Sequence, residues 1–310
     1  MMSKKPEARS KSIDKPEGRA SFVFVPDNKR ISDPAKIQRR LCDASIFPYS
    51  FVVGADTQFG LISKTKNNNL DDWDAERTLM SKCIDQINHL TPKPQFFVII
   101  GDMCDSSPTS NNEYARRRNQ ERDFFTIMDT LDEDIYFVAV SGEHDLGDDP
   151  THSSMNRYRL SFGQEFFDFV IAGVRFIVLN SQYYISNTHV ASFAEDQERW
   201  LDEKLKEGNS GPHGPIIFMH VPPFVEDIQE PDSKEAISKS TREKLMKKLV
   251  SGGVRYIFCG HLHKNANATY NHLEVITTTA IGHQMGSDKP GFRVVTVHTD
   301  RIEHNFVPIN

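Results

Sequence analysis

The residues best suited to chemistry follow a short apolar run near the middle of the chain. Residues 137–140 lead through a serine and Gly142 to Glu143, His144 and Asp145. A strand that ends in a tight turn delivers its next side chains to the carboxyl end of a sheet, where open α/β folds place their chemistry. Because imidazole exchanges protons near neutral pH, we interpret His144 as a proton donor.

Four further apolar runs are followed at once by a carboxylate, an imidazole or an amide. Each case alone is weak, because an aspartate after a strand is more often a helix cap and a lone histidine more often packs or is exposed. Together they predict one site of mixed oxygen and nitrogen donors, suited to Mn, Fe, Zn or Mg. Since the set contains no cysteine, a structural zinc site is not expected. The residues are Asp56, Gln58, Asp102, Asp105, His220, His261 and His263.

The elements that must position these residues alternate between strands and helices. Strands over 51–53, 96–100 and 137–140, with helices over 74–90 and within 113–131, indicate parallel βαβ units. A hairpin is expected over 167–179, helices over 194–207 and 240–250, and buried strands over 216–219 and 254–259. Strand candidates at 274–281, 291–298 and 301–307 suit an antiparallel edge. The pattern predicts an α/β fold with two sheets packed face to face and helices outside.

Composition indicates a globular chain with a sizeable core. The 310 residues are 38% hydrophobic and 26% charged, with a net charge of −6. This mild charge does not indicate a nucleic-acid partner. We expect no membrane span, because no apolar run approaches the roughly 20 residues that a spanning helix needs. The scattered cysteines and the lack of a secretion signal favour reduced thiols and a cytoplasmic location.

The first 45 residues differ from the remainder. Residues 1–40 hold eleven Lys or Arg against five Asp or Glu, with few large apolar side chains. Such a segment cannot bury enough surface to fold alone, so we expect a basic, flexible tail over 1–45 and one folded domain over 46–310.

The strand-end residues form a recognisable motif series. Asp56-x-Gln58, Gly101-Asp102-x-x-Asp105, Gly142-x-His144-Asp145, His220 and Gly260-His261-x-His263 resemble the calcineurin-like metallophosphoesterase superfamily over about residues 50–308. The resemblance implies a four-layer α/β/β/α sandwich of two mixed sheets and a site for two divalent metal ions. Asp56 and His263 would hold the first ion, with Gln58 where many relatives have a histidine. Asp102 would bridge both ions, and Glu143, His220 and His261 would hold the second.

Shorter stretches resemble a serine/threonine phosphoprotein phosphatase branch of that family. They lie at 54–60, 179–182 and 280–282. The resemblance implies a phosphoprotein substrate and hydrolysis of its phosphate monoester by hydroxide held between the two ions. His144 would act as general acid, with the Asp105 carboxylate bonded to its other ring nitrogen. A monomer is favoured.

Besides Gln58, two positions depart from the family pattern and leave alternatives open. Glu143 stands where relatives usually have asparagine, and Ser106 stands where phosphatases related to calcineurin have an arginine. A carboxylate at 143 adds negative charge, which repels a dianionic monoester. The chain could instead be a phosphodiesterase acting on a nucleotide or a phospholipid headgroup. It could also be a weakly active or non-catalytic scaffold with an impaired second metal site.

Overall fold

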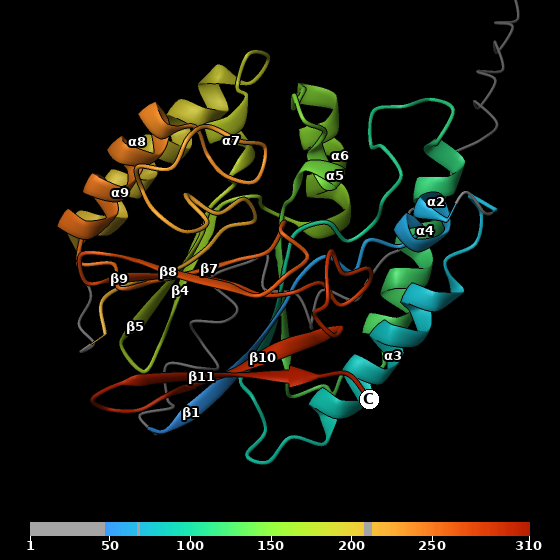
Figure 1. Cartoon of the computed structure of the whole chain (residues 1–310), viewed down its shortest axis with the longest axis horizontal. Helices are drawn as coiled ribbons and strands as arrows, with labels where there is room; N and C mark the ends of the chain where they lie inside the picture. Colours follow the sequence, from blue (N-terminus) through green and yellow to red (C-terminus); the bar gives the residue numbers. More distant parts are fainter. Residues whose placement is uncertain (1–46, 67–68, 208–212) are drawn as a thin grey trace, which may run out of the picture.

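Two mixed β-sheets form the centre of the fold in the computed structural model, which describes residues 47–66, 69–207 and 213–310 (Figure 1). In the first sheet, three parallel strands are extended by an antiparallel pair at one edge, as the βαβ pattern predicts. Its strand order is β11 (Ile302–Pro308), β10 (Gly291–Val297), β1 (Tyr49–Gly54), β2 (Phe96–Ile100) and β3 (Tyr136–Val140).

The second sheet has four parallel inner strands and one antiparallel strand at each edge. The expectation that the strand starting near residue 274 lies at an antiparallel edge is wrong, because β9 pairs in parallel with β7. The edge strand is β8, which the sequence pattern did not indicate because its residues Ala-Asn-Ala-Thr-Tyr lack a strong apolar alternation. The order is β4 (Phe167–Ile171), β5 (Val174–Val178), β6 (Ile216–Phe218), β7 (Tyr256–Cys259), β9 (Leu273–Thr277) and β8 (Ala266–Tyr270).

Aromatic side chains fill the space between the two sheets. Phe51 and Phe96 of the first sheet stack with ring centroids 4.7 Å apart, and Phe176 of the second sheet meets both edge-on at 5.4 and 5.2 Å. All three rings are fully buried. Burying one such side chain is worth about 1.5–3 kcal/mol, so this layer holds the two sheets together.

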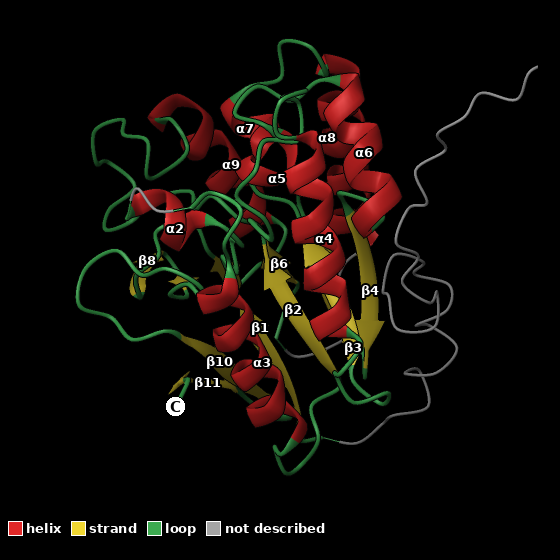
Figure 2. Ribbon diagram, turned by 90° about the vertical axis from the view of Figure 1, so that its right-hand side faces the viewer, coloured by secondary structure: helices red, strands yellow, loops and turns green. Residues whose placement is uncertain are grey.

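Helices cover the outer face of each sheet, so the predicted four-layer arrangement is confirmed (Figure 2). In α3, Met80, Ile84 and Ile87 recur at helical spacing and are buried against the first sheet. The first sheet is covered by α3 (Asp74–Asn88), α4 (Tyr114–Met128) and α6 (His152–Phe162), and the second by α8 (Ala191–Glu207) and α9 (Lys239–Ser251). Three short helices lie in the loops, namely α2 (Leu61–Thr65), α5 (Glu143–Leu146) and α7 (Gln182–Ile185).

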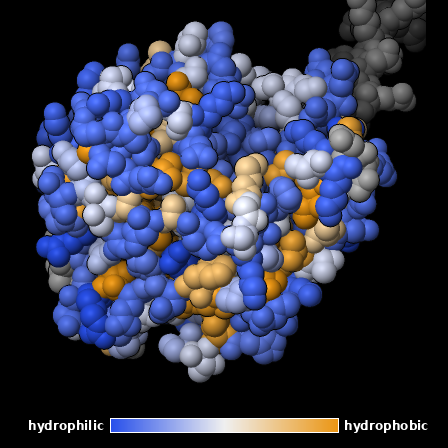
Figure 3. Space-filling model, viewed as in Figure 1, coloured by the Kyte–Doolittle hydropathy of each residue, from blue (hydrophilic) through white to orange (hydrophobic). Residues whose placement is uncertain are grey.

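Other expectations from composition concern the surface, the thiols and the tail. Hydrophilic side chains dominate the face seen in Figure 3, with apolar ones scattered between them. Cys83, Cys104 and Cys259 are buried free thiols, as expected, whereas Cys42 lies outside the described residues. Within the described ranges, every helix is too short or too polar to cross a bilayer. The predicted basic tail over 1–45 also lies outside the described residues.

Candidate metal centre and active site

Residues from five separate loops meet where the parallel strands of both sheets end. Asp56 follows β1, Asp102 follows β2, and Glu143 begins α5 just after β3. His220 and His261 follow β6 and β7 of the second sheet. The structure therefore brings together side chains that are spread over more than half of the chain.

The backbone is strained at this point of the fold. Left-handed conformations cost a non-glycine residue about 1–3 kcal/mol and persist only where the surroundings enforce them. In the described ranges, the only such residues outside the loops of this site are Ala172 and Asn271, which lie in hairpin turns. The strained residues of the site, with φ between 36° and 70°, are Asp56, Gln58, Asp102, His261 and His263.

Glycines let these loops approach one another closely. A Cβ atom on Gly101, whose φ is 79°, would lie 2.2 Å from Nδ1 of His220. A Cβ atom on Gly142 would lie 2.2 Å from Oδ1 of Asp102. Real Cβ atoms do not approach other atoms this closely, so the glycines that precede the strand-end residues are required by packing.

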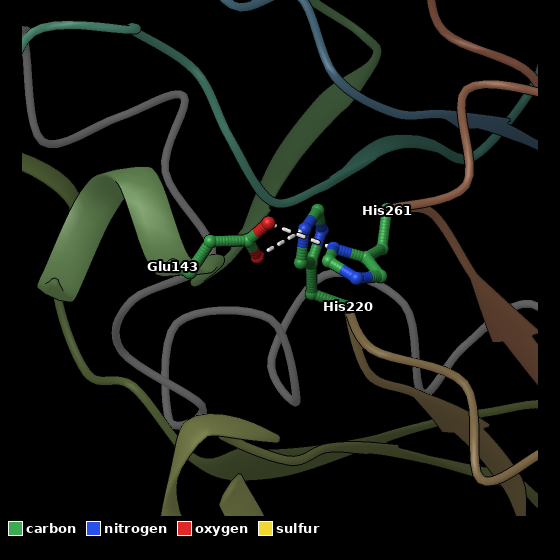
Figure 4. A group of neighbouring side chains, drawn as sticks. All are labelled: Glu143, His220 and His261. Carbon is green, nitrogen blue, oxygen red and sulfur yellow. Dashed lines mark ion pairs between the residues drawn. The ribbon is translucent and has the colours of Figure 1, made fainter. Parts of the chain in front are cut away.

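The carboxylate of Glu143 faces two histidines that come from loops of the second sheet (Figure 4). Its Oε2 is 2.9 Å from Nε2 of His220, and its Oε1 is 2.7 Å from Nδ1 of His261. Burial raises the pKa of Glu143, but the two imidazoles outweigh it and hold that pKa well below its usual value. The carboxylate is therefore negatively charged at neutral pH.

The tautomers of these histidines can be assigned from their second ring nitrogens. Nδ1 of His220 lies 2.7 Å from the carbonyl of Ile100, and Nε2 of His261 lies 2.9 Å from the carbonyl of Lys234. Because a carbonyl only accepts, these nitrogens carry the hydrogens. In the neutral rings, the nitrogens that face Glu143 then present lone pairs to a carboxylate.

Two imidazole lone pairs that face a carboxylate need a positive charge between them and the carboxylate oxygens. The inward nitrogens of His220 and His261 are buried and make no hydrogen bond of proper geometry within the described residues. Burial lowers the pKa of His220, but Asp102 and Glu143 outweigh it and raise that pKa well above its usual value. Either a proton or a bound cation can supply the charge, so the residues fit a divalent metal ion.

A second group of donors adjoins the first and shares His220. Nε2 of His220 lies 3.4 Å from Oδ2 of Asp102 and 3.8 Å from Oδ1 of Asp56, and Nε2 of His263 lies 3.5 Å from the same Asp56 oxygen. Burial raises the pKa of Asp56 to about 6. Asp56, Asp102 and His220 can hold one cation, and Glu143, His220 and His261 another. The two groups overlap, because both use Nε2 of His220, whose Nδ1 is bonded to the carbonyl of Ile100.

Gln58 lies beside this second group. Its Nε2 donates to Oδ1 of Asp105 over 3.4 Å, while its Oε1 is buried without a hydrogen bond in the described part of the chain. The amide oxygen therefore remains free to accept a further partner, and the ligand role of Gln58 stays a prediction.

The predicted acid, His144, stands next to both groups. Its backbone N–H donates to Oδ1 of Asp102 over 2.9 Å, and its side chain is 30% exposed. Burial lowers its pKa, but Asp102, Asp105 and Glu143 outweigh this effect and raise that pKa. The imidazole therefore holds a proton at neutral pH more readily than a free histidine does.

Asp105 contacts His144 mainly through its backbone. Nδ1 of His144 is 3.1 Å from the Asp105 carbonyl and 3.5 Å from the nearer carboxylate oxygen. The carbonyl therefore orients the ring, and the carboxylate acts on it through charge. The same carboxylate pairs with Lys64 at 3.0 Å, a contact that the sequence pattern did not indicate. Lys64 thus places a positive charge next to this loop, whereas the buried Ser106, which stands where related phosphatases have an arginine, carries no charge.

Arg117 of α4 ties the site loops together and was missed from the sequence. Its Nη1 donates to the carbonyls of Cys104, Ser106 and His144 over 3.1, 3.2 and 2.7 Å. Its Nη2 pairs with Asp145 at 3.0 Å. The local sequence, Tyr-Ala-Arg-Arg-Arg, gives no local sign of which arginine is buried, since only the rotation of α4 against the sheet decides it.

Asp145, the partner of Arg117, also joins two of the site loops. Its carboxylate accepts hydrogen bonds from the backbone N–H groups of Gly142, Asp102 and Met103 at 3.1, 2.8 and 3.2 Å. Asp145 therefore holds the loop after β2 against the loop after β3.

Arg117→Met is expected to destabilise the protein by about 3–5 kcal/mol, because it leaves the buried Asp145 carboxylate without its counter-charge. Chemical unfolding in urea measures this loss. Arg122→Met, on the exposed side of the same helix, is the matched control and should stay within about 0.5 kcal/mol of the native chain. Equal effects of the two substitutions would show that Arg117 does not hold the loops.

Comparison with known proteins independently supports the family resemblance that the sequence motifs indicate. A family model described as calcineurin-like phosphoesterase matches residues 50–265. The serine/threonine-protein phosphatase CPPED1 of Mus musculus is 37% identical over 269 residues, covering 85% of each chain. A cAMP/cGMP dual specificity phosphodiesterase of Mycobacterium tuberculosis is 24% identical and covers 74% of this chain and 71% of its own. The solved structure of a dimetal phosphatase from Danio rerio has the same fold, with a TM-score of 0.55, 17% identity and coverage of 84% and 99%.

Proposed function

The chain belongs to the calcineurin-like phosphoesterase family, and from that premise we propose that it is a two-metal phosphatase of phosphoserine or phosphothreonine in proteins. Members of this family are hydrolases that use divalent metal ions, and the chain gathers residues that can hold such ions. The observation that carries the proposal is the pair of buried histidine nitrogens, on His220 and His261, that face the Glu143 carboxylate.

We assign the donors to two positions. Asp56, Gln58 and His263 would hold one ion, and Glu143, His220 and His261 the other, with Asp102 between them. When bound, the two ions would supply Lewis-acid stabilisation of the phosphoryl oxygens and activation of the attacking water. The contacts of the Glu143 carboxylate with both histidines support its role as a donor and argue against an impaired second site.

The residues of the chain then perform the proton transfer. Nδ1 of His144 donates to the carbonyl of Asp105, which leaves Nε2 to carry the second proton of the charged ring. That proton passes to the serine or threonine oxygen as its bond to phosphorus breaks. The carboxylates of Asp102 and Asp105 favour the protonated imidazole, because they raise its pKa.

Removal of metal is expected to abolish turnover of an aryl phosphate by the purified full chain, and Mn²⁺ is expected to restore it. Elemental analysis before and after chelation gives the number of ions that accompany activity. Circular dichroism controls for unfolding of the chelated protein. If the chelated protein keeps its full rate while its metal content falls to zero, the proposal fails.

A phosphodiesterase is the second candidate function. The extra charge of Glu143 repels a dianionic monoester more than a singly charged diester. A relative of 24% identity is also named as a phosphodiesterase of cyclic nucleotides. Rates on an aryl phosphate monoester, an aryl diester and a phosphoserine peptide separate the two functions, and faster diester turnover favours the second.

We further propose that the chain is a cytoplasmic monomer with phosphoproteins as partners. The three buried free thiols in the described ranges support a reducing compartment.

A further inference from the structure

Two loops that leave the active site form the walls of a separate cleft. One runs from Asp105 into α4, and the other runs from His144 into α6. They meet where Gly147 lies against Thr109, since a Cβ on Gly147 would be 4.0 Å from the Thr109 methyl group. With α4 and α6, these loops enclose a cleft of about 470 Å³. The cleft therefore lies between the chain segments that continue from Asp105 and from His144, and its lining begins at Pro108.

The lining of this cleft is rich in groups that donate hydrogen bonds. Glu121 is the acidic residue in the lining, and both of its oxygens are already engaged. Its Oε1 accepts from Nε of Arg117 at 2.8 Å, and its Oε2 accepts from the hydroxyl of Ser161 at 3.2 Å. The hydroxyl and amide side chains in the lining include Thr109, Ser110, Asn111, Ser153 and Asn156.

Arg157 provides a positive charge that Glu121 influences only from a distance. Its guanidinium lies 4.5 Å from the ring centre of Tyr114, and Nη1 donates to the carbonyl of Pro108 over 3.2 Å. Its Nη2 is buried and lacks an acceptor, and no carboxylate pairs with Arg157 among the residues that the structure describes. Arg118 approaches the same ring at 5.9 Å, so two cations border the cleft.

This arrangement suits a phosphate group. A half-buried guanidinium without a directly paired counter-ion is costly. Burial lowers the pKa of Arg157, and the charge of the nearby Glu121 offsets this effect only in part. A phosphate monoester in the cleft would give the Arg157 guanidinium an anionic partner and would accept hydrogen bonds from the surrounding hydroxyl groups; Nη2, which is shielded from solvent in this structure, would reach it after a rotation of the side chain. Planar guanidinium groups recognise phosphate through paired, charge-assisted hydrogen bonds.

We propose that this cleft is an accessory phosphate-binding site, which takes a second phosphate on the same phosphoprotein. The substrate part of the proposal rests on the proposed phosphatase function. His144 gives its proton to the leaving oxygen, so the protein that carries this oxygen departs on the side of His144. The cleft lies between the loops on that side, where a phosphate on a nearby residue of the substrate would reach it.

The binding test uses Arg157→Gln, with Arg122→Gln on an exposed part of α4 as the matched control. Inorganic phosphate is titrated calorimetrically into the metal-free full chain, so that binding through cations at the active site does not contribute. We expect Arg157→Gln to weaken phosphate binding about tenfold, the loss of one charge-assisted hydrogen bond, and Arg122→Gln to leave it unchanged. Arg157→Lys, which keeps the charge, should retain part of the binding.

The catalytic test compares peptides with one or two phosphoserines. In the metal-loaded protein, Arg157→Gln should lower the preference for the doubly phosphorylated peptide and leave the rate on an aryl phosphate unchanged. Failure of the native metal-free chain to bind phosphate, or equal binding by Arg157→Gln, overturns the site. If Arg157→Gln weakens phosphate binding but leaves the preference for the doubly phosphorylated peptide unchanged, the cleft does not bind a second phosphate of the substrate, and free phosphate is its ligand instead. Lack of turnover on every ester refutes the phosphatase function but leaves the calorimetric result standing.

Discussion

His144→Ala is expected to lower kcat on a phosphoserine peptide by about 10²–10⁴-fold, the usual contribution of general acid catalysis. The serine alkoxide is a poor leaving group, so it depends on the proton that His144 holds. An aryl phosphate leaves as a more stable phenoxide and depends less on that proton. The loss should therefore be smaller on the aryl ester, and steady-state rates on both substrates measure the difference.

His144 also lies close enough to Asp102 and Glu143 to contribute to a cation site, so the same variant needs a second readout. If His144 acts only as an acid, its removal does not affect metal binding. The metal content of the variant, measured by elemental analysis, should then equal that of the native chain. A variant that loses one equivalent of metal, with equal rate losses on both esters, would make His144 a ligand instead. Full activity on the peptide would remove it from the mechanism.

Glu143→Ala is expected to weaken binding of one Mn²⁺ ion by at least about 100-fold. Partners that only support a ligand are worth about 10–100-fold in metal affinity, and Glu143 contacts both histidines directly. Without the carboxylate, His220 and His261 lose the anion that lies between them. Calorimetric titration of Mn²⁺ into the chelated protein measures the affinity independently of turnover.

Glu143→Asn is the matched control for this experiment, because an amide oxygen can still bind a cation but carries no charge. We expect it to lie between the native chain and Glu143→Ala in Mn²⁺ affinity, and to favour the dianionic monoester more than the native chain does. Unchanged affinity in both variants would exclude Glu143 from the site. It would then revive the scaffold hypothesis for this chain.

Much of the fold could be predicted because its signals are local. Buried runs such as 96–100 and the helical spacing of Met80, Ile84 and Ile87 depend only on near neighbours in sequence. Their alternation predicted parallel strands whose carboxyl ends share an edge. The second sheet was harder, because the partner of a strand depends on distant residues, as the parallel pairing of β9 with β7 shows.

The sequence by itself indicated which donors to expect at the candidate site, because they follow strands whose ends can be predicted. The tertiary structure decided how these donors face one another. Glu143 reaches His220 and His261 only because two separate sheets pack with their strand ends aligned. The carbonyl of Asp105 orients His144, and Arg117 reaches three loops, through contacts that no local pattern encodes. Such contacts depend on the rotation of helices and the packing of sheets, which are set by the whole core.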